Sequence, residues 1–398
     1  MIQLCGDQII TPLEIIYKNC VSQSIYPTAW KRSNVVPIHK KGNKNDIKNY
    51  RPISLLPIFS KIFEKLIFNA IYNHLQINNL LASQQSGFRP VDSCVSQLLS
   101  ITHEIFHAFD CNPTLEVRGV FLDISKAFDK VWHKGLLHKL EKYGLSGNLL
   151  ALINNFLSDR QQRVLLNGQS SDWKNISAGV PQGSVLAPLF FLIYINDLPN
   201  GLKSNVKIFA DDTSLFSIVD DPTLSHEDLN HDLNLINTWA HQWKMSFNPD
   251  PSKQAIEVIF SHKRSPPLHT SLTFNNMPVA NEGVQKHLGL YLDNQLSFNH
   301  HLKEKLSKAN KGIGIIKKLS WYLPRSSLVS IYTMFVRPHL DYADIIYDRP
   351  NNEVFKSKLE SIQYNAALAI TGAVRGTSME KIFNEIGFEF LADRRWLR

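Results

Sequence analysis

Three aspartates beside apolar, strand-like segments are the residues of this sequence best suited to catalysis. Asp123 ends the run Val120-Phe121-Leu122, and Asp211 and Asp212 follow Ile208-Phe209-Ala210. The end of a buried strand brings its side chains to the edge of a sheet, where ligands commonly bind. Carboxylates gathered there repel one another unless cations lie between them. We therefore expect the three aspartates to bind divalent cations.

Magnesium is the natural cation for such a site. It takes oxygen ligands and keeps positions open for water or substrate phosphate. Two ions about 3.5–4 Å apart can stabilise the attacking and leaving oxygens of a phosphoryl transfer. We therefore expect two Mg²⁺ ions, or Mn²⁺ in their place, with Asp123, Asp211 and Asp212 as ligands. Taken alone, the Asp211-Asp212 pair favours a simpler interpretation, a polar turn, because aspartates are common in turns.

The spacing of apolar residues predicts the elements that position these aspartates. Steps of three and four residues predict helices over 59–75 and 95–109, and further helices are expected over 136–143, 149–157 and 223–246. Hairpin turns are expected at Gly42-Asn43 and Asn167-Gly168. From His301 onward the chain is mostly helical and rich in lysine, which indicates a separate helical domain. Strands are expected over 120–123, 163–166, 206–209, 213–218, 256–260 and 288–292.

Composition favours a globular protein with a polyanionic partner. The 398 residues carry 43 Lys+Arg against 35 Asp+Glu, a formal net charge of +8. A basic balance is typical of proteins that bind nucleic acid or acidic membranes, although a mildly basic soluble protein would share it. The apolar run 185–195 contains Pro188 and is too short to span a bilayer, and no signal peptide is recognisable, so we expect a soluble chain with no membrane partner.

The cysteines give no sign of a zinc ribbon or a disulfide framework. All four are scattered without a C-x-x-C pair, which fits a reducing, intracellular setting. A zinc peptidase is nevertheless one alternative, because His103-Glu104-Ile105-Phe106-His107 matches H-E-x-x-H on an expected helix. Both histidines fall on the polar flank of that helix and no third-ligand signature follows. We interpret the match as chance in a chain with 15 histidines.

Six motifs follow one another along nearly the whole chain. They are Asn49-Tyr50-Arg51-Pro52-Ile53-Ser54-Leu55-Leu56, Gln85-Ser86-Gly87-Phe88-Arg89, Phe121-Leu122-Asp123-Ile124-Ser125-Lys126-Ala127-Phe128-Asp129, Gly179-Val180-Pro181-Gln182-Gly183-Ser184-Val185-Leu186-Ala187-Pro188, Phe209-Ala210-Asp211-Asp212 and His287-Leu288-Gly289-Leu290. A single F-A-D-D would be weak, but this ordered set is not expected by chance. With these motifs the chain resembles the reverse transcriptases of non-LTR (LINE-type) retrotransposons, in particular those of the jockey group.

The resemblance implies an RNA-directed DNA polymerase, a nucleotidyltransferase that extends a DNA primer along an RNA template with deoxynucleoside triphosphates. Asp123 and Asp211 would be metal ligands, with Asp212 the adjoining carboxylate. The primer 3′-hydroxyl would attack the α-phosphate and pyrophosphate would leave. Phe128, five residues after Asp123, would act as a steric gate against a ribose 2′-hydroxyl. The alternative for Phe128 is a core aromatic residue.

Other motif positions would bind the substrates. Gln182 and Gly183 would lie against the nascent base pair, because glycine permits close approach of the backbone, although a simple turn is the alternative. Arg51, with Lys40 or Lys41, would grip the triphosphate, unless they form a solvated basic loop.

Two further segments complete the implied machinery. Lys253 follows Asn248-Pro249-Asp250-Pro251-Ser252 and would supply a proton to pyrophosphate, although the spacing departs from the family's compact N-x-x-K-T. Leu288, Gly289 and Leu290 would form the primer grip. Lysines after His301 would follow the phosphate backbone.

The expected fold is α+β with the right-handed polymerase architecture. Fingers are expected over 1–118, palm with interleaved fingers elements over 119–295, and a helical thumb with a C-terminal extension over 296–398. The rival within nucleic-acid proteins is a catalytically silent or domesticated copy that only binds nucleic acid. The family normally has further upstream segments and an endonuclease domain, so we expect a fragment of a larger element. The family's way of life implies the nucleus, and oligomeric state is undetermined by the sequence.

Overall fold

The computed structural model describes residues 6–40, 42–263, 268–349 and 352–396. A five-stranded sheet lies at its centre, in the order β12-β9-β3-β8-β7. The middle strand, β3, pairs antiparallel with both β8 and β9. The strands of this sheet are β3 (Glu116–Asp123), β7 (Asn205–Phe209), β8 (Asp212–Ile218), β9 (Ala255–Ser261) and β12 (Ala280–Asn281).

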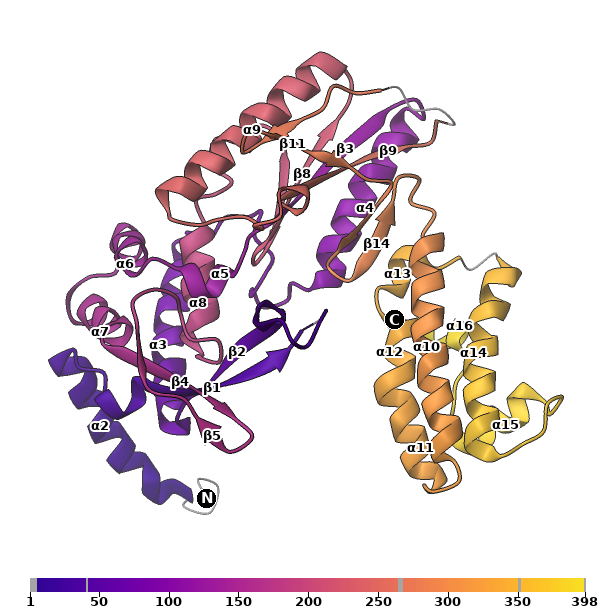
Figure 1. Cartoon of the computed structure of the whole chain (residues 1–398), viewed down its shortest axis with the longest axis horizontal. Helices are drawn as coiled ribbons and strands as arrows, with labels where there is room; N and C mark the ends of the chain where they lie inside the picture. The colour runs from indigo at the N-terminus through magenta and orange to yellow at the C-terminus, as the bar shows by residue number, and fades with distance from the viewer. Residues whose placement is uncertain (1–5, 41, 264–267, 350–351, 397–398) are drawn as a thin grey trace.

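Helices cover both faces of this sheet, because alternate side chains of β3 point to opposite faces. Val120 and Leu122 pack into one core cluster with α9 and α8, whereas Val117 and Phe121 pack into a second with α4 and the C-terminal helices. Figure 1 shows α9 and α4 on either side of the sheet. All residues of β3 except its last, Asp123, are buried, so the strand's sequence delivers one carboxylate to the surface.

The helices expected over 59–75, 95–109, 136–143 and 149–157 are present as α3, α4, α6 and α7. Ser93 caps α4 with a capping box: it accepts from the Ser96 N–H, and the Ser96 hydroxyl accepts in return. Asp221 caps α9, because its side chain accepts from the N–H groups of Thr223 and Leu224. The helices are α2 (Ile10–Gln23), α3 (Ile58–Ile77), α4 (Cys94–Cys111), α5 (Ala127–Lys130), α6 (His133–Lys142), α7 (Gly147–Leu157), α8 (Leu186–Ile195) and α9 (Pro222–Gln242).

A second sheet, ordered β2-β1-β4-β5 with β6 on β4, is built by two hairpins. β1 and β2 are antiparallel, and β1 also pairs parallel with β4. The expected turn at Asn167-Gly168 joins β4 to β5, and the expected turn near Gly42 lies in the connection from β1 to β2. The strands are β1 (Arg32–His39), β2 (Tyr50–Leu55), β4 (Arg160–Leu166), β5 (Gln169–Ser170) and β6 (Lys174–Ile176).

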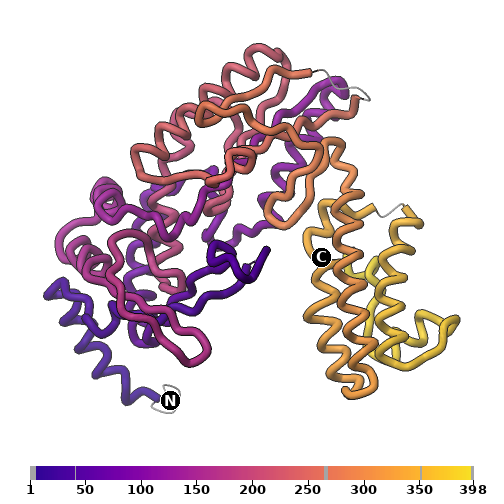
Figure 2. Tube along the Cα trace, in the orientation of Figure 1, coloured from indigo at the N-terminus to yellow at the C-terminus, as the bar shows by residue number. Residues whose placement is uncertain are grey.

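The C-terminal helices form a bundle on the opposite side of the view from α2 and α7 (Figures 1 and 2). A short hairpin, β13 (Val284–His287) and β14 (Leu290–Asp293), leads into it. The bundle contains α10 (Asn299–Leu319), α11 (Arg325–Ile331), a π-helical turn η5 (Tyr332–Val336), α12 (Arg337–Asp341), α13 (Asp344–Tyr347), α14 (Glu353–Thr371), α15 (Met379–Ile386) and α16 (Leu391–Trp396).

Short elements complete the fold. The ladder β10–β11 lies beside α9, and η4 precedes β9. Among the described residues, no helix is both long and apolar enough to cross a membrane. The short elements are η1 (Gly6–Ile9), η2 (Thr28–Trp30), η3 (Ile47–Asn49), η4 (Pro251–Lys253), β10 (Thr273–Phe274) and β11 (Met277–Pro278).

Two expected elements were wrong in part. The helix expected over 223–246 ends at Gln242, because Lys244 takes a left-handed φ of 55° and turns the chain. The strand expected over 288–292 begins only at Leu290, since Leu288 and Gly289, with φ of 44° and 86°, form the two-residue turn between β13 and β14. Two central residues with positive φ are typical of a type I′ hairpin turn.

Candidate active site

The three predicted aspartates meet at one end of the central sheet. Asp123 and Asp212 are direct partners in the antiparallel register of β3 and β8. Asp211 lies one residue earlier, in the two-residue turn between β7 and β8, where Phe209 pairs with Asp212. Strand pairing therefore brings together carboxylates that lie almost ninety positions apart in the sequence.

The turn that carries Asp211 is held from outside by the segment 84–87. Ala210 opens the turn with a left-handed φ of 56°. The buried Gln85 side chain accepts from the Ala210 N–H at 3.1 Å and from the Gly87 N–H at 2.7 Å. A Cβ on Gly87 would lie 2.2 Å from the Ala210 nitrogen, so only glycine permits this approach. Gln85 thus fixes the backbone next to Asp211.

The same segment is anchored to β7 on both sides of Gln85. The Ser86 N–H donates to the Ile208 carbonyl, and the Ile208 N–H donates to the Gln84 carbonyl, each at 2.9 Å. Gln85 belongs to a motif that carried the family resemblance, but no role for it could be inferred from the sequence. Its role depends on β7, whose contact with this segment has no local sequence signal.

Asp123 is oriented by a residue that sequence reasoning missed. The Asn248 side-chain amide donates to Asp123 Oδ2 at 2.7 Å, and the Asn248 N–H donates to the Asp123 carbonyl at 3.0 Å. The Asp123 N–H in turn donates to the Gln254 carbonyl at 3.1 Å. In the sequence, Asn248 and Pro249 serve only to locate Lys253. Hydrogen bonds that orient a carboxylate ligand are nevertheless usual around metal sites.

The electrostatics of the cluster favour a cation. Partial burial and the negative charges of Asp211 and Asp123 raise the pKa of Asp212 to about 6, although Asp212 still reaches solvent. Burial is also the main cause of the raised pKa of Asp211, to which Asp123 adds. A divalent cation between such carboxylates would relieve both the lost hydration and the mutual repulsion.

The carboxylates fit an open metal site better than a closed cage. In the described ranges, no three His, Cys, Asp or Glu side chains converge closely enough to hold an ion by themselves. Magnesium at nucleotide sites is usually bound by one or two carboxylates and completed by water and substrate phosphates. Hard oxygen donors at the surface end of β3 and β8 match that pattern.

Two basic residues of the second sheet face the cluster. Lys40 follows β1, and its positive charge lowers the pKa of both Asp211 and Asp212. Arg51 lies on β2 and acts on the pKa of Asp211 in the same direction. Lys41, the other predicted triphosphate residue, lies outside the described residues. The hairpin of β1 and β2 therefore brings exposed positive charge within electrostatic reach of the aspartates.

The loop 179–184 connects the second sheet to α5. The Gln182 carbonyl accepts from the Ser54 N–H of β2 at 2.7 Å, while its side-chain amide donates to Asp129 Oδ1 at 2.9 Å. Gly183 has a φ of 129°, and a Cβ there would lie 2.4 Å from the Ser54 carbonyl oxygen. Gly183 is thus required by contact with β2, which the sequence could not indicate.

Phe128 is half-buried in α5, between two other rings. It stacks on Phe191 at a centroid distance of 5.0 Å and meets Phe88 edge-on at 5.9 Å. Its carbonyl accepts from the Val180 N–H at 2.8 Å, which ties α5 to the loop 179–184. The ring is therefore packed on one side and stays partly accessible, a placement compatible with both a gate and a core role.

The remaining predicted residues are held by partners other than the aspartates. Lys253 is exposed and forms an ion pair with Asp250 at 2.5 Å. Leu288 and Gly289 are held by Tyr342 of the C-terminal bundle, whose hydroxyl donates to the Leu288 carbonyl. A Cβ on Gly289 would lie 3.1 Å from the Tyr342 ring.

The H-E-x-x-H segment does not form a metal site in the described structure. His103 and His107 are exposed on α4, with ring centroids 6.3 Å apart. Glu104 instead pairs with Lys207 of β7 at 2.6 Å. This ion pair joins α4 to the central sheet.

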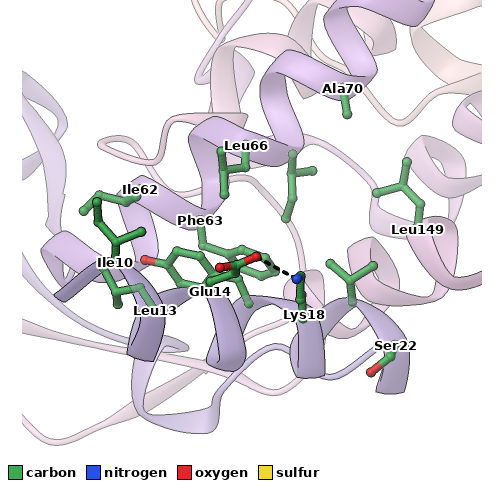
Figure 3. Close-up of a pocket in the computed structure, with 13 residues that line it drawn as sticks. Ile10, Leu13, Glu14, Lys18, Ser22, Ile62, Phe63, Leu66, Ala70 and Leu149 are labelled. Atoms are coloured by element: carbon green, nitrogen blue, oxygen red, sulfur yellow. Dashed lines mark ion pairs between the residues drawn. The ribbon is translucent and has the colours of Figure 1, made fainter. Parts of the chain in front are cut away.

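A large apolar pocket lies between α2 and α3. It has a volume of about 920 Å³ and is lined mainly by aliphatic and aromatic side chains, with the Glu14–Lys18 ion pair at its edge (Figure 3). None of the predicted site residues lines it.

Residues 38–300 match the family model described as Reverse transcriptase (RNA-dependent DNA polymerase). The chain belongs to this reverse transcriptase family. The matched residues contain the central sheet, the second sheet except most of β1, and the three aspartates. Members of the family generally use divalent metal ions.

The relatives confirm the resemblance to jockey-type elements. The chain is 30% identical over 87% of its length to the RNA-directed DNA polymerase from mobile element jockey of Drosophila melanogaster, covering 38% of that protein. It is 30% identical over 95% of its length to the probable RNA-directed DNA polymerase from transposon X-element of the same species, covering 43% of it. The chain thus spans about two fifths of the length of these curated relatives.

Solved structures confirm the expected fold class. Apo telomerase from Candida tropicalis matches with a TM-score of 0.50 and 13% identity, covering 98% of this chain and 66% of that one. Telomerase from Candida albicans, in complex with a fragment of telomeric RNA, matches with a TM-score of 0.50 and 11% identity, covering 94% of this chain and 70% of that one. The α+β polymerase architecture is therefore shared, whereas such low identity shows nothing further.

Proposed function

We propose that this chain is an RNA-directed DNA polymerase that extends a DNA primer along an RNA template. The observation that supports it most strongly is the pairing of Asp123 with Asp212 across β3 and β8, beside Asp211 in the turn. The charges of Lys40 and Arg51 reach the same place. Carboxylates for metal ions and cations for phosphates at one point fit phosphoryl transfer to a nucleotide.

Asp123, Asp211 and Asp212 would hold two Mg²⁺ or Mn²⁺ ions. When bound, these ions supply charge stabilisation at the attacking and leaving oxygens. The chain's own contribution is to fix the carboxylates before substrate arrives. Asn248 orients Asp123, and Gln85 fixes the backbone beside Asp211.

The second sheet and α5 would bind the incoming nucleotide. Arg51 and Lys40, and Lys41 beside it, would bind the triphosphate, where arginine can offer two donors. Gln182 and Gly183 would lie against the nascent base pair, since their loop is anchored on β2 and on Asp129. Phe128 would exclude a ribose 2′-hydroxyl with the accessible side of its ring.

Roles for Lys253 and for the turn between β13 and β14 are also part of the proposal. Lys253 would donate a proton to pyrophosphate, which requires its ammonium to exchange Asp250 for the leaving group. The turn Leu288-Gly289, with Leu290, would position the primer end, and it is anchored on the bundle by Tyr342.

The chain would divide into the parts of a polymerase hand. Fingers would occupy 1–118, palm with interleaved fingers elements 119–295, and thumb with a C-terminal extension 296–398. The interleaving is supported by β4, which lies in the second region yet pairs with β1 of the first. The bundle from α10 onward supports the third region. An RNA template and a DNA primer would lie against these parts.

Primer extension tests the proposal directly. The full chain should extend oligo(dT) on poly(rA) with dTTP and Mg²⁺ or Mn²⁺, and Asp211→Asn should abolish extension. Asp110→Asn is the matched control, because Asp110 is an exposed aspartate on α4 and should leave extension unchanged. Binding of primer–template without extension would instead identify a catalytically silent copy. Extension that survives in Asp211→Asn would contradict the proposal.

A further inference from the structure

One hydrogen bond joins the carboxylate of Asp129 to the side-chain amide of Gln182. The Gln182 Nε2 atom donates to Asp129 Oδ1 at 2.9 Å, and both side chains are half-buried. An ionised carboxylate has only acceptor atoms, so it can bind an amide through the amide nitrogen and never through the amide oxygen. Ionised Asp129 therefore leaves the acceptor atom Gln182 Oε1 as the free end of the amide.

The charges on α5 support the ionised form of Asp129. Burial raises the pKa of the Asp129 carboxyl, whereas the hydrogen bond from Gln182 and the positive charges of Lys126 and Lys130 lower it. Lys126 is the N-cap of α5 and Lys130 is its last residue. The same short helix thus carries the carboxylate and two cations that favour its charged form.

The backbones on both sides of this hydrogen bond are held by other contacts. The Phe128 carbonyl accepts from the Val180 N–H at 2.8 Å. A Cβ on Gly179 would lie 2.7 Å from the Asp129 carbonyl oxygen, so the two chain segments touch directly. Because these contacts do not involve the carboxylate, its removal should free the amide without displacing the loop 179–184.

The free end of the amide is accessible, and α5 is linked to the support of the aspartates. Among the described residues no group bonds to Gln182 Oε1, and this atom is not closed to solvent. The ring of Phe128 meets Phe88 at a centroid distance of 5.9 Å, and the residue before Phe88 packs on the turn that carries Asp211. The helix that binds the amide is therefore in contact with the segment that holds the aspartate turn.

We propose that Asp129 is a positioning residue that turns the Gln182 amide so that its oxygen faces the incoming nucleotide. The amide then offers an acceptor to a hydroxyl or amino donor of that nucleotide. The inference rests on the proposed function, in which Gln182 lies against the nascent base pair. Without the carboxylate the amide can flip and present its nitrogen, which cannot accept from such a donor. Because Asp129 acts through Gln182, its removal should weaken nucleotide binding and spare the chemical step.

Binding of dTTP to a stalled complex tests this assignment. The full chain is bound to poly(rA) primed with oligo(dT) that ends in a dideoxynucleotide, so that no bond can form, and the Kd of dTTP is measured with Ca²⁺ in place of Mg²⁺. Asp129→Leu should raise this Kd about tenfold, since the amide loses the partner that orients it. Asp129→Asn should give an intermediate Kd, because its amide can hold Gln182 in either orientation.

Two features keep the measurement interpretable. Asp110→Leu, at an exposed aspartate on α4, is the matched control and should leave the Kd of dTTP unchanged. Asp129→Asn has the shape of the aspartate, so it gives a folded variant for the test if thermal melting shows that Asp129→Leu does not fold. Equal Kd values in Asp129→Asn and the unaltered chain would then overturn the inference.

Exchange of the two groups supplies a rescue. Gln182→Glu alone sets two carboxylates within hydrogen-bond distance, and their repulsion should weaken dTTP binding. Asp129→Asn combined with Gln182→Glu restores a donor opposite an acceptor and keeps an oxygen at the free end. The double variant should therefore bind dTTP more tightly than Gln182→Glu. In primer extension, a positioning role raises the KM of Asp129→Leu for dTTP and leaves kcat within about twofold, whereas a merely structural role lowers kcat as well.

The outcomes separate this inference from the proposed function. A chain that binds dTTP in the stalled complex but never extends a primer would refute the polymerase reaction, and the effect of Asp129→Leu on the Kd would still decide the inference. An unchanged Kd in Asp129→Leu, or no recovery in the double variant, would overturn the inference alone. Absence of dTTP binding in the unaltered chain would overturn both.

Discussion

At the scale of single residues, two uncharged amide side chains, Asn248 and Gln85, hold the backbone and carboxylates of the aspartate cluster in place. Asp123, Asp211 and Asp212 could be found because each lies beside a short apolar run, which is a local signal. Asn248 could not, because its contact with Asp123 joins positions 125 residues apart. A side-chain amide in a turn has many ordinary explanations, and only the folded chain selects one of them.

Substitution of Gln85 tests whether such a supporting contact matters for metal binding. Gln85→Leu removes the acceptor for the Ala210 N–H and leaves that buried donor unpaired, so the turn with Asp211 should lose its fixed geometry. Removing such an orienting contact typically costs about 10- to 100-fold in metal affinity or activity. The half-saturating Mg²⁺ concentration in primer extension and the Mn²⁺ dissociation constant measured by EPR should both rise by that factor.

Gln76→Leu, at an exposed glutamine on α3, is the control and should leave both readouts unchanged. Gln85→Glu keeps an oxygen at the acceptor position and should recover part of the lost affinity. Unaltered Mg²⁺ and Mn²⁺ dependence in Gln85→Leu would show that Gln85 is no more than a packing residue.

Phe128 tests whether the gate or the core interpretation holds. Phe128→Ala should admit ribonucleotides, because the accessible side of the ring would no longer occupy the space of a 2′-hydroxyl. The measurement is the ratio of kcat/KM for dTTP and UTP on poly(rA). Phe68→Ala, a half-buried ring stacked on Tyr72 in α3, should leave the ratio unchanged. Equal ratios in Phe128→Ala and the unaltered chain would assign Phe128 to the core.

At the scale of elements, periodicity predicted helices and strands well but not how loops are anchored. The helices α3 and α4 appear within two residues of their expected ends. The loop 179–184 was recognised by its motif, yet its position depends on the buried Glu64 of α3. The Glu64 carboxylate accepts from the Ser184 hydroxyl at 2.6 Å, the Val185 N–H at 2.8 Å and the Tyr26 hydroxyl at 2.9 Å. A glutamate on the buried face of a helix gives no such signal in sequence.

Substitution of Glu64 should therefore disturb both stability and the loop. The carboxylate lies at the N-terminus of α8, and its charge acts on the fully buried Arg160. Glu64→Leu would leave three hydrogen-bond donors without their acceptor and would take a negative charge from the surroundings of that guanidinium, at a cost of about 3 kcal/mol or more in the free energy of unfolding. Urea denaturation measures the loss. Glu14→Ala breaks an exposed ion pair and should change stability little, and an equally small effect of Glu64→Leu would contradict the account.

At the scale of the whole molecule, one tyrosine joins three parts of the chain. The Tyr342 hydroxyl of the C-terminal bundle donates to the Leu288 carbonyl in the β13–β14 turn, and the same side chain lies beside Cys94 at the start of α4. The sequence predicted the helical region but placed Leu288 and Gly289 in a strand, and it could not show how the hairpin and the bundle are connected. Contacts between such remote segments depend on topology rather than on local pattern.

Tyr342→Phe should loosen this junction without unfolding the chain. The loss of one hydrogen bond costs about 1 kcal/mol of stability. If the hairpin positions the primer end, affinity for a primer–template should fall severalfold, as measured by fluorescence anisotropy, while affinity for dTTP stays the same. Tyr322→Phe, an exposed tyrosine after α10, is the control. Unchanged primer–template affinity in Tyr342→Phe would contradict a positioning role for the junction.

The account depends most on divalent cations binding between β3 and the β7–β8 turn. Fe²⁺ substituted for Mg²⁺ cleaves polypeptide backbone close to its binding site when ascorbate and peroxide are added. Mass spectrometry should locate cuts beside both Asp123 and Asp211. Excess Mg²⁺ should suppress these cuts, and Asp211→Asn should lose them. Cuts at only one of the two segments, or elsewhere in the chain, would contradict a shared metal site.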